Sequence, residues 1–252
     1  MLKTRIMPVL LFKEMTLVKG RAFDAWRRVE VPQSAIRVFN MRGVDELVFL
    51  DITATLEERL PDFSLIDDLA DDCFMPFTVG GGVRDVDTVG RLLEVGADKV
   101  AINTAAVEVP GLIADAANRY GSQCIVAAID YRGGGDRPAE VFVRAGHQPT
   151  GIDPVPLACR LADEGAGEIL LTSIERDGMM MGYDVDTAAS VNEAVNIPVI
   201  AAGGCGSYQH MADVLAGAQV GAVAASSIFH FSEMTPRGAK NYLAERGFPV
   251  RQ

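Results

Sequence analysis

The sequence predicts an α/β fold in which eight parallel strands, each followed by a helix, close into a barrel. Three observations carry this prediction: short apolar runs alternate with longer amphipathic segments, the two halves of the chain repeat, and glycine-rich turns recur at repeated positions. Apolar runs of Val, Ile and Leu between amphipathic segments are typical of buried parallel strands joined by crossover helices. At 252 residues, 49% of them hydrophobic and 23% charged, the chain has the size of one such barrel and is not disordered.

The eight expected strands, in chain order, are residues 5–11, 46–51, 77–80, 99–102, 124–130, 168–173, 198–202 and 221–225. Helical segments are expected after them, for example 85–95, where Val86, Val89, Leu92 and Leu93 form one apolar stripe, and 154–164. Residues 131–151 differ, because a glycine-rich turn is followed by an alternating stretch. We expect a small hairpin there, on the loop after the fifth strand.

The chain repeats itself at half its length. Residues 46–51 align with 168–173, and Gly81 and Gly82 align with Gly203 and Gly204, at an offset of 122 residues. A doubly wound open sheet, the alternative fold, gives no reason for such a repeat. No Pro/Ser-rich linker interrupts the chain, so we expect residues 1–252 to form a single (β/α)8 TIM barrel with an internal half-barrel duplication.

Composition narrows the classes of function. The formal net charge of −11 opposes binding to nucleic acid or to an anionic membrane surface. No apolar run reaches the roughly 20 residues of a membrane span, and the start of the chain lacks a signal-peptide pattern. The four cysteines lie far apart, which favours a reduced cytoplasm, and the three histidines have no i,i+4 spacing, which argues against a metal site. We expect no cofactor.

Small residues dominate four of the turns that follow strands, where a barrel holds its chemistry. One expected group contains Gly81, Gly82, Asn103 and Thr104, and the other contains Gly203, Gly204 and Ser226. Glycines and helix starts let backbone N–H groups approach an anion. Tight-turn geometry would also explain a glycine pair, but the repeat favours two phosphate sites on opposite sides of the mouth.

Three carboxylates follow strands: Asp51, Asp130 and Asp177. Each is a candidate general acid or base, with a helix cap or a loop ion pair as the alternative. By the duplication, Leu11 stands where a second carboxylate opposite Asp130 would be expected.

Charges of alternating sign begin four strands at the other end of the barrel: Arg5, Glu46, Lys99 and Glu168. They can be solvated strand ends, or they can close a ring of ion pairs across the barrel bottom and gate a passage.

These residues resemble one family, the cyclase subunit of imidazole glycerol phosphate synthase, a lyase of histidine biosynthesis. The matching stretches are DELVFLDIT (45–53), FTVGGG (77–82), GADKVAINTAAVE (96–108), GAGEILLTS (165–173) and RDG (176–178). The resemblance implies a barrel that takes ammonia from a glutaminase subunit docked at its N-terminal face, through a gate matched by the four charges above. It also implies a bisphosphate ligand at the far mouth and makes Lys19 a site residue.

The first loop departs from the family. Asp130 matches one of the two catalytic aspartates, but Leu11 occupies the position of the other. LFKEMT (11–16) replaces DVKDGR, and EVP (30–32) replaces GDP, although Lys19 and Phe23 remain. Because leucine transfers no proton, we expect cyclase activity to fall on the order of 10²–10⁴-fold.

One branch of the family shares a Leu-Leu-x-Lys first strand and stretches similar to CFMP (73–76), GSQC (121–124) and TGIDPV (150–155). That branch is associated with amidation of N-acetyl sugars in surface polysaccharide (O-antigen type) synthesis, alongside a glutaminase and a separate amidotransferase. The resemblance favours this role. A histidine-pathway cyclase and a noncatalytic scaffold that activates the glutaminase are the alternatives.

Overall fold

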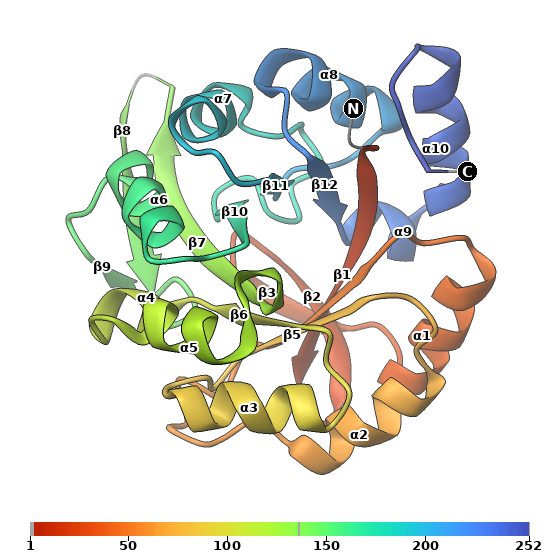
Figure 1. Cartoon of the computed structure of the whole chain (residues 1–252). Helices are drawn as coiled ribbons and strands as arrows, with labels where there is room; N and C mark the ends of the chain where they lie inside the picture. The colour runs from red at the N-terminus through yellow and green to blue at the C-terminus, as the bar shows by residue number, and fades with distance from the viewer. Residues whose placement is uncertain (1–2, 136, 252) are drawn as a thin grey trace.

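The computed structural model describes residues 3–135 and 137–251, and it confirms the predicted barrel (Figure 1). Eight parallel strands form the wall: β1 (Arg5–Lys13), β4 (Leu47–Asp51), β5 (Phe77–Gly80), β6 (Lys99–Ile102), β7 (Ile125–Gly134), β10 (Glu168–Ser173), β11 (Val199–Ala202) and β12 (Ala222–Ala225). Each pairs with the next in that order. Pairing of β12 with β1 joins the two halves and closes the wall.

Helices surround this wall. They are α1 (Pro32–Met41), α2 (Phe63–Asp72), α3 (Val86–Glu94), α4 (Thr104–Glu108), α5 (Leu112–Tyr120), α6 (Pro154–Asp163), α7 (Val185–Ala194), α8 (Tyr208–Ala218), α9 (Ser227–Phe231) and α10 (Pro236–Glu245). The stripe expected in segment 85–95 faces the wall, with Val89 and Leu92 fully buried. Asp85 caps α3 through its side chain instead of starting the helix.

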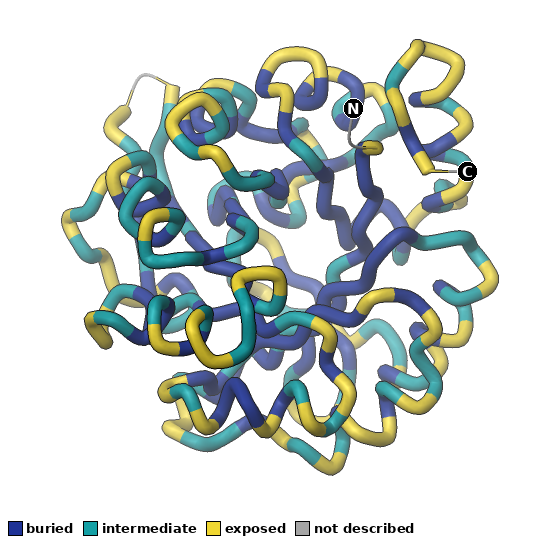
Figure 2. The backbone as a smooth tube through the Cα atoms, viewed as in Figure 1, coloured by how far each residue is buried: buried dark blue, intermediate teal, exposed yellow. Residues whose placement is uncertain are grey.

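The barrel has two apolar cores. The larger one lies between the strands and the helices, and in Figure 2 the strands at the centre are dark blue while the helices show exposed outer faces. The second fills the inside of the barrel and contains, among the described residues, nine buried side chains, four of them alanine: Met7, Val48, Ala101, Val126, Ala128, Leu170, Ile200, Ala222 and Ala224. The barrel interior is therefore apolar, and alanine is its commonest residue.

The expected hairpin after the fifth barrel strand is present. β7 continues beyond the barrel and pairs with β8 (Arg137–Val143), which pairs with β9 (Gln148–Pro149). The strand boundaries differ by a few residues from those expected. Cys124 belongs to the short 3-10 turn η1 (Ser122–Cys124), and β7 extends to Gly134 where the sequence suggested an end at Asp130.

A second hairpin was not foreseen. β1 runs on to Lys13 and pairs antiparallel with β2 (Thr16–Arg21), which pairs with β3 (Asp24–Arg28). Sequence reasoning missed it because its turns lack the usual glycine or asparagine. Glu14 and Met15, then Ala22 and Phe23, adopt φ values between 49° and 62° although none of them is glycine.

No helix within 3–135 and 137–251 is long and apolar enough to cross a bilayer.

Candidate functional site

An open cavity lies at the C-terminal ends of the barrel strands. It brings together Leu11, Lys19, Asp51, Gly81, Gly82, Asn103, Thr104, Asp130, Asp177, Gly203 and Ser226, which the sequence analysis had singled out. Gly204 is the expected member that does not line it. Its α-carbon is turned toward the carbonyl of Gly182, and a Cβ there would lie 2.1 Å from that oxygen.

Asp130 lines this cavity together with the carboxylates of Asp51 and Asp177. It ends the barrel part of β7, on the opposite side of the ring from Leu11 on β1. Burial raises the pKa of Asp130 to about 7; a hydrogen bond with Thr172 opposes the rise and the charge of Asp177 adds to it. At neutral pH this group can therefore donate or accept a proton. Across from it, Leu11 offers only an apolar surface.

Lys19 and Asp177 form a buried ion pair at the rim. Lys19 Nζ lies 2.7 Å from each carboxylate oxygen of Asp177. The backbone adds a second link, because the Ala22 N–H donates to the Asp177 carbonyl at 2.8 Å. The pair thereby ties the β2–β3 hairpin to the loop after β10, and it holds the lysine at the mouth.

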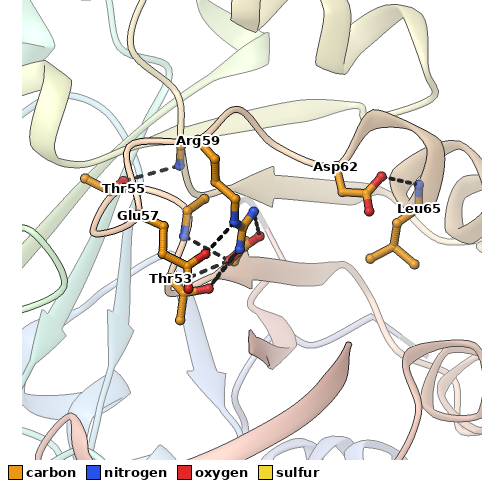
Figure 3. A network of polar contacts seen from close by, with 9 residues as sticks. Thr53, Thr55, Glu57, Arg59, Asp62 and Leu65 are labelled. Atoms are coloured by element: carbon orange, nitrogen blue, oxygen red, sulfur yellow. Dashed lines mark hydrogen bonds and ion pairs between the residues drawn. The ribbon is translucent and has the colours of Figure 1, made fainter. Parts of the chain in front are cut away.

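Asp51 lines the cavity, but its carboxylate is already occupied. Arg59 binds both oxygens at 2.7 and 2.9 Å, and Thr53 and Ala54 donate backbone N–H bonds to it at 3.1 Å. Figure 3 shows the Arg59 guanidinium reaching into this network from the loop after β4, beside Glu57 and Thr53. Hydrogen bonding to Asp51 raises the pKa of Arg59 above its ordinary value. In this geometry Asp51 orders the loop.

The two glycine pairs adopt the same unusual backbone. Gly81 and Gly82 have φ of 104° and 71°, and Gly203 and Gly204 have φ of 86° and 105°. A Cβ on Gly81 would lie 2.1 Å from the Asp51 carbonyl, and one on Gly203 would lie 2.5 Å from that of Ser173. Only glycine fits these turns.

The helices that follow the next strands share a second feature. α4 and α9 each have five residues, and Asn103 and Ser226, which precede them, make no side-chain capping bond. An Asp, Ser or Thr side chain caps α2, α3, α6, α7, α8 and α10, whereas α1 and α5 also lack a side-chain cap. The first turns of α4 and α9 both face the cavity, where an anion would supply the missing acceptor.

The N-terminal end of the barrel carries the four charges predicted to meet there. Arg5 Nη1 lies 2.9 Å from Glu46 and 2.7 Å from Glu168, and Lys99 Nζ lies 2.9 and 3.2 Å from the same two residues. Burial opposes the charge on Glu46, but Arg5 and Lys99 outweigh it and lower the pKa of that carboxyl. The four side chains alternate in sign around one ring, which we call the ion-pair ring.

Sequence reasoning missed two kinds of residue that shape the site. Thr172, the β10 residue that pairs with Asp130 across the strands, lines the cavity, and the aromatic Trp26 on β3 lines its mouth. A threonine inside a strand gives no signal of its role. Trp26 was missed because the hairpin that carries it was missed.

The donor set does not suggest a metal. Among the described residues, no three His, Cys, Asp or Glu side chains are grouped so as to hold an ion.

A family model with the description "Histidine biosynthesis protein" matches residues 5–235. The chain belongs to this family. The match spans the ion-pair ring, both glycine turns and the whole barrel wall, and it supports the resemblance to cyclase-type barrels at the level of the family. Membership of the histidine biosynthesis family thus accounts for the fold. The role of the first-loop residues has to be inferred from this chain itself.

Proposed function

We propose that this protein is the barrel subunit of a glutamine-dependent enzyme, taking ammonia from a glutaminase at its N-terminal face and delivering it toward a phosphorylated small molecule at the C-terminal mouth. One observation carries the proposal. An ion-pair ring lies at one end, a cavity lined by both glycine turns lies at the other, and the interior between them consists of apolar side chains, among which alanine is the commonest.

The interior favours a neutral passenger. Moving an ammonium ion past Met7, Val48 and Leu170 would leave a charge without partners in an apolar medium, at a cost of several kcal/mol or more. Ammonia carries no charge and is the size of a water molecule. The ring can admit it by a small movement of Lys99, the member with the most exposed side chain.

The molecule that accepts the ammonia is inferred from Leu11, in the first half of the site. With Leu11 facing Asp130, only one of the two proton-transfer groups of the cyclase family is present. This departure supports the paralogous role, in which the ammonia serves amidation of an N-acetyl sugar in surface polysaccharide synthesis through a separate amidotransferase. Polysaccharide genes beside this gene would support the role, and histidine genes would contradict it.

The ring is tested with the glutaminase from the same organism. Lys99→Ala should leave glutamine hydrolysis in the complex while ammonia escapes into the solvent, read by a coupled ammonia assay. Lys240→Ala is the matched control, because Lys240 forms a similarly buried ion pair with Asp45 at 2.7 Å but stands outside the ring. No binding or stimulation of the glutaminase by the wild-type chain would refute the proposal.

A second candidate is an active cyclase of histidine biosynthesis. The pKa of Asp130, raised to about 7, favours it, since one competent acid–base group remains beside the Lys19–Asp177 pair. The wild type should then turn over the cyclase substrate at an ordinary rate with an ammonium salt. If the paralogous role holds, the wild type is slow and Leu11→Asp raises the rate. A third outcome, glutaminase stimulation that survives loss of anion binding, would indicate a scaffold.

A further inference from the structure

Trp26 is the only tryptophan of the chain, and it stands at the mouth of the cavity. It is the one half-buried residue of β3, whose other four residues are exposed. Within the described part of the chain, no acceptor receives a hydrogen bond from its indole N–H. A large aromatic side chain left half in water beside a cavity contributes little to folding but offers much contact area to a ligand.

The position of the indole is fixed by its neighbours. Trp26 packs over Gly20 on β2 so closely that a Cβ there would lie 2.8 Å from the ring. The adjacent Arg27 stacks on Phe231 of α9, with 4.5 Å between the guanidinium carbon and the ring centroid. A wall that is ordered before binding loses little entropy on binding.

The far end of the hairpin is equally fixed. Phe23 packs against the turn at Gly146, where a Cβ would lie 2.9 Å from its ring, and the Lys19–Asp177 pair holds the strand beside it. Leu11 and Val9 on β1 and Leu50 on β4 also line the cavity and add apolar surface to its wall.

Apolar walls and anion-binding turns in one cavity define a ligand of mixed character. The phosphate-bearing end belongs near the uncapped start of α9, where the buried Ser226 hydroxyl has no partner among the described residues. β3 lies against that helix through Arg27, so the next group of the ligand meets the hairpin.

We propose that Trp26 is a stacking wall that selects phosphorylated ligands carrying a ring with an apolar face, either a planar base or a pyranose. This inference rests on the proposed anion site and adds the chemistry of the group attached to the phosphate. Stacking on an aromatic side chain is worth about tenfold or more in affinity per ring.

The test uses the whole chain and three probes: glycerol 3-phosphate, which has no ring, AMP, which carries a planar base, and N-acetylglucosamine 1-phosphate, which carries a pyranose. Because the protein has a single tryptophan, its fluorescence reports directly on Trp26. We expect at least one ring-bearing probe to change the emission and to bind about tenfold tighter than glycerol 3-phosphate by calorimetry. The identity of that probe distinguishes base from pyranose.

Two variants complete the test. Trp26→Ala should remove the tenfold advantage and leave the affinity for glycerol 3-phosphate unchanged, whereas Trp26→Phe should keep most of the advantage. If glycerol 3-phosphate binds and the ring adds nothing, or if Trp26→Ala binds all probes like the wild type, the stacking wall is refuted and the anion site stands. If no probe binds, the anion site fails as well.

Discussion

The two halves of the barrel have similar glycine turns at the mouth, but they differ in whether the polar groups beside these turns already have hydrogen-bond partners. In the first half, the Gly82 N–H donates to Thr55 at 3.3 Å, and the Thr104 hydroxyl accepts the Arg144 N–H at 2.9 Å. In the second half, the Ser226 hydroxyl is buried with no partner within 3–135 and 137–251. The first half satisfies these polar groups, and the second leaves one without a partner among the described residues.

The same asymmetry appears in the acid–base groups. The second half presents Asp130 into the cavity, and the first presents Leu11. The fold sets the backbone that both halves share, so the side chains of each half can change independently. One half can bond its polar groups within the protein while the other keeps an acid–base group.

The first prediction, with the strongest effect, concerns the glycine turns, which have similar φ values in the two halves. Gly81→Ala and Gly203→Ala should each lower the free energy of unfolding by about 4 kcal/mol, because a Cβ would collide with a backbone carbonyl at a positive φ. Gly111→Ala is the control, since Gly111 has φ of 81° with nothing within 4 Å. It should cost only about 1 kcal/mol in urea denaturation. Similar losses at all three positions would contradict the close-packing argument.

The second prediction concerns the pH dependence of stability, to which Asp130 of the second half contributes and Leu11 of the first half does not. The unfolded state ionises Asp130 near pH 4, but the folded state holds it protonated up to about pH 7. The wild type is therefore penalised progressively as pH rises from 4 to 7, and the penalty is then constant. Asp130→Asn should remove it and be more stable above pH 7 by on the order of 4 kcal/mol. Stability curves of the two proteins that stay parallel from pH 4 to 8 would contradict the assignment.

The third effect concerns the two helix starts. Ser226→Ala should weaken binding of inorganic phosphate by about tenfold without loss of stability, since its hydroxyl has no protein partner to lose. Thr104→Ala should instead cost about 1 kcal/mol of stability, because the Arg144 N–H loses its acceptor, with a smaller effect on phosphate. Calorimetry and denaturation of both variants check this. The reverse pattern would show that the first half is the ligand-ready one.

The fourth prediction, with the weakest effect, concerns the Gly82 turn in the first half of the barrel. Thr55→Val keeps the shape of the side chain but frees the Gly82 N–H for an anion. We expect phosphate binding to strengthen by about twofold, with at most a small loss of stability. An unchanged affinity, measured beside the Ser226→Ala variant, would mean that the Gly82 N–H takes no part in anion binding.

Much of the site could be predicted because its residues lie at the C-terminal ends of the barrel strands. Every barrel strand carries its C-terminal residue to the same mouth, so Asp130, Asn103 and Gly203 meet there whatever the loops do. The partnership of Asp51 with Arg59 was not predictable, because the loop that returns Arg59 eight residues later has no periodic pattern. That contact decides whether Asp51 is free to react.

The barrel could be deduced from the sequence, since the spacing of apolar runs and the half-chain repeat allow few other ways to bury those strands. The sequence also placed the four charges of the ion-pair ring on one end. Which polar groups remain without a partner depends on the folded chain, because hydrogen-bond partners such as Arg144 for Thr104 come from segments far apart in the sequence. The tertiary structure decided the aromatic wall as well, since turns at Met15 and Phe23 adopt left-handed backbone that packing, rather than residue preference, stabilises.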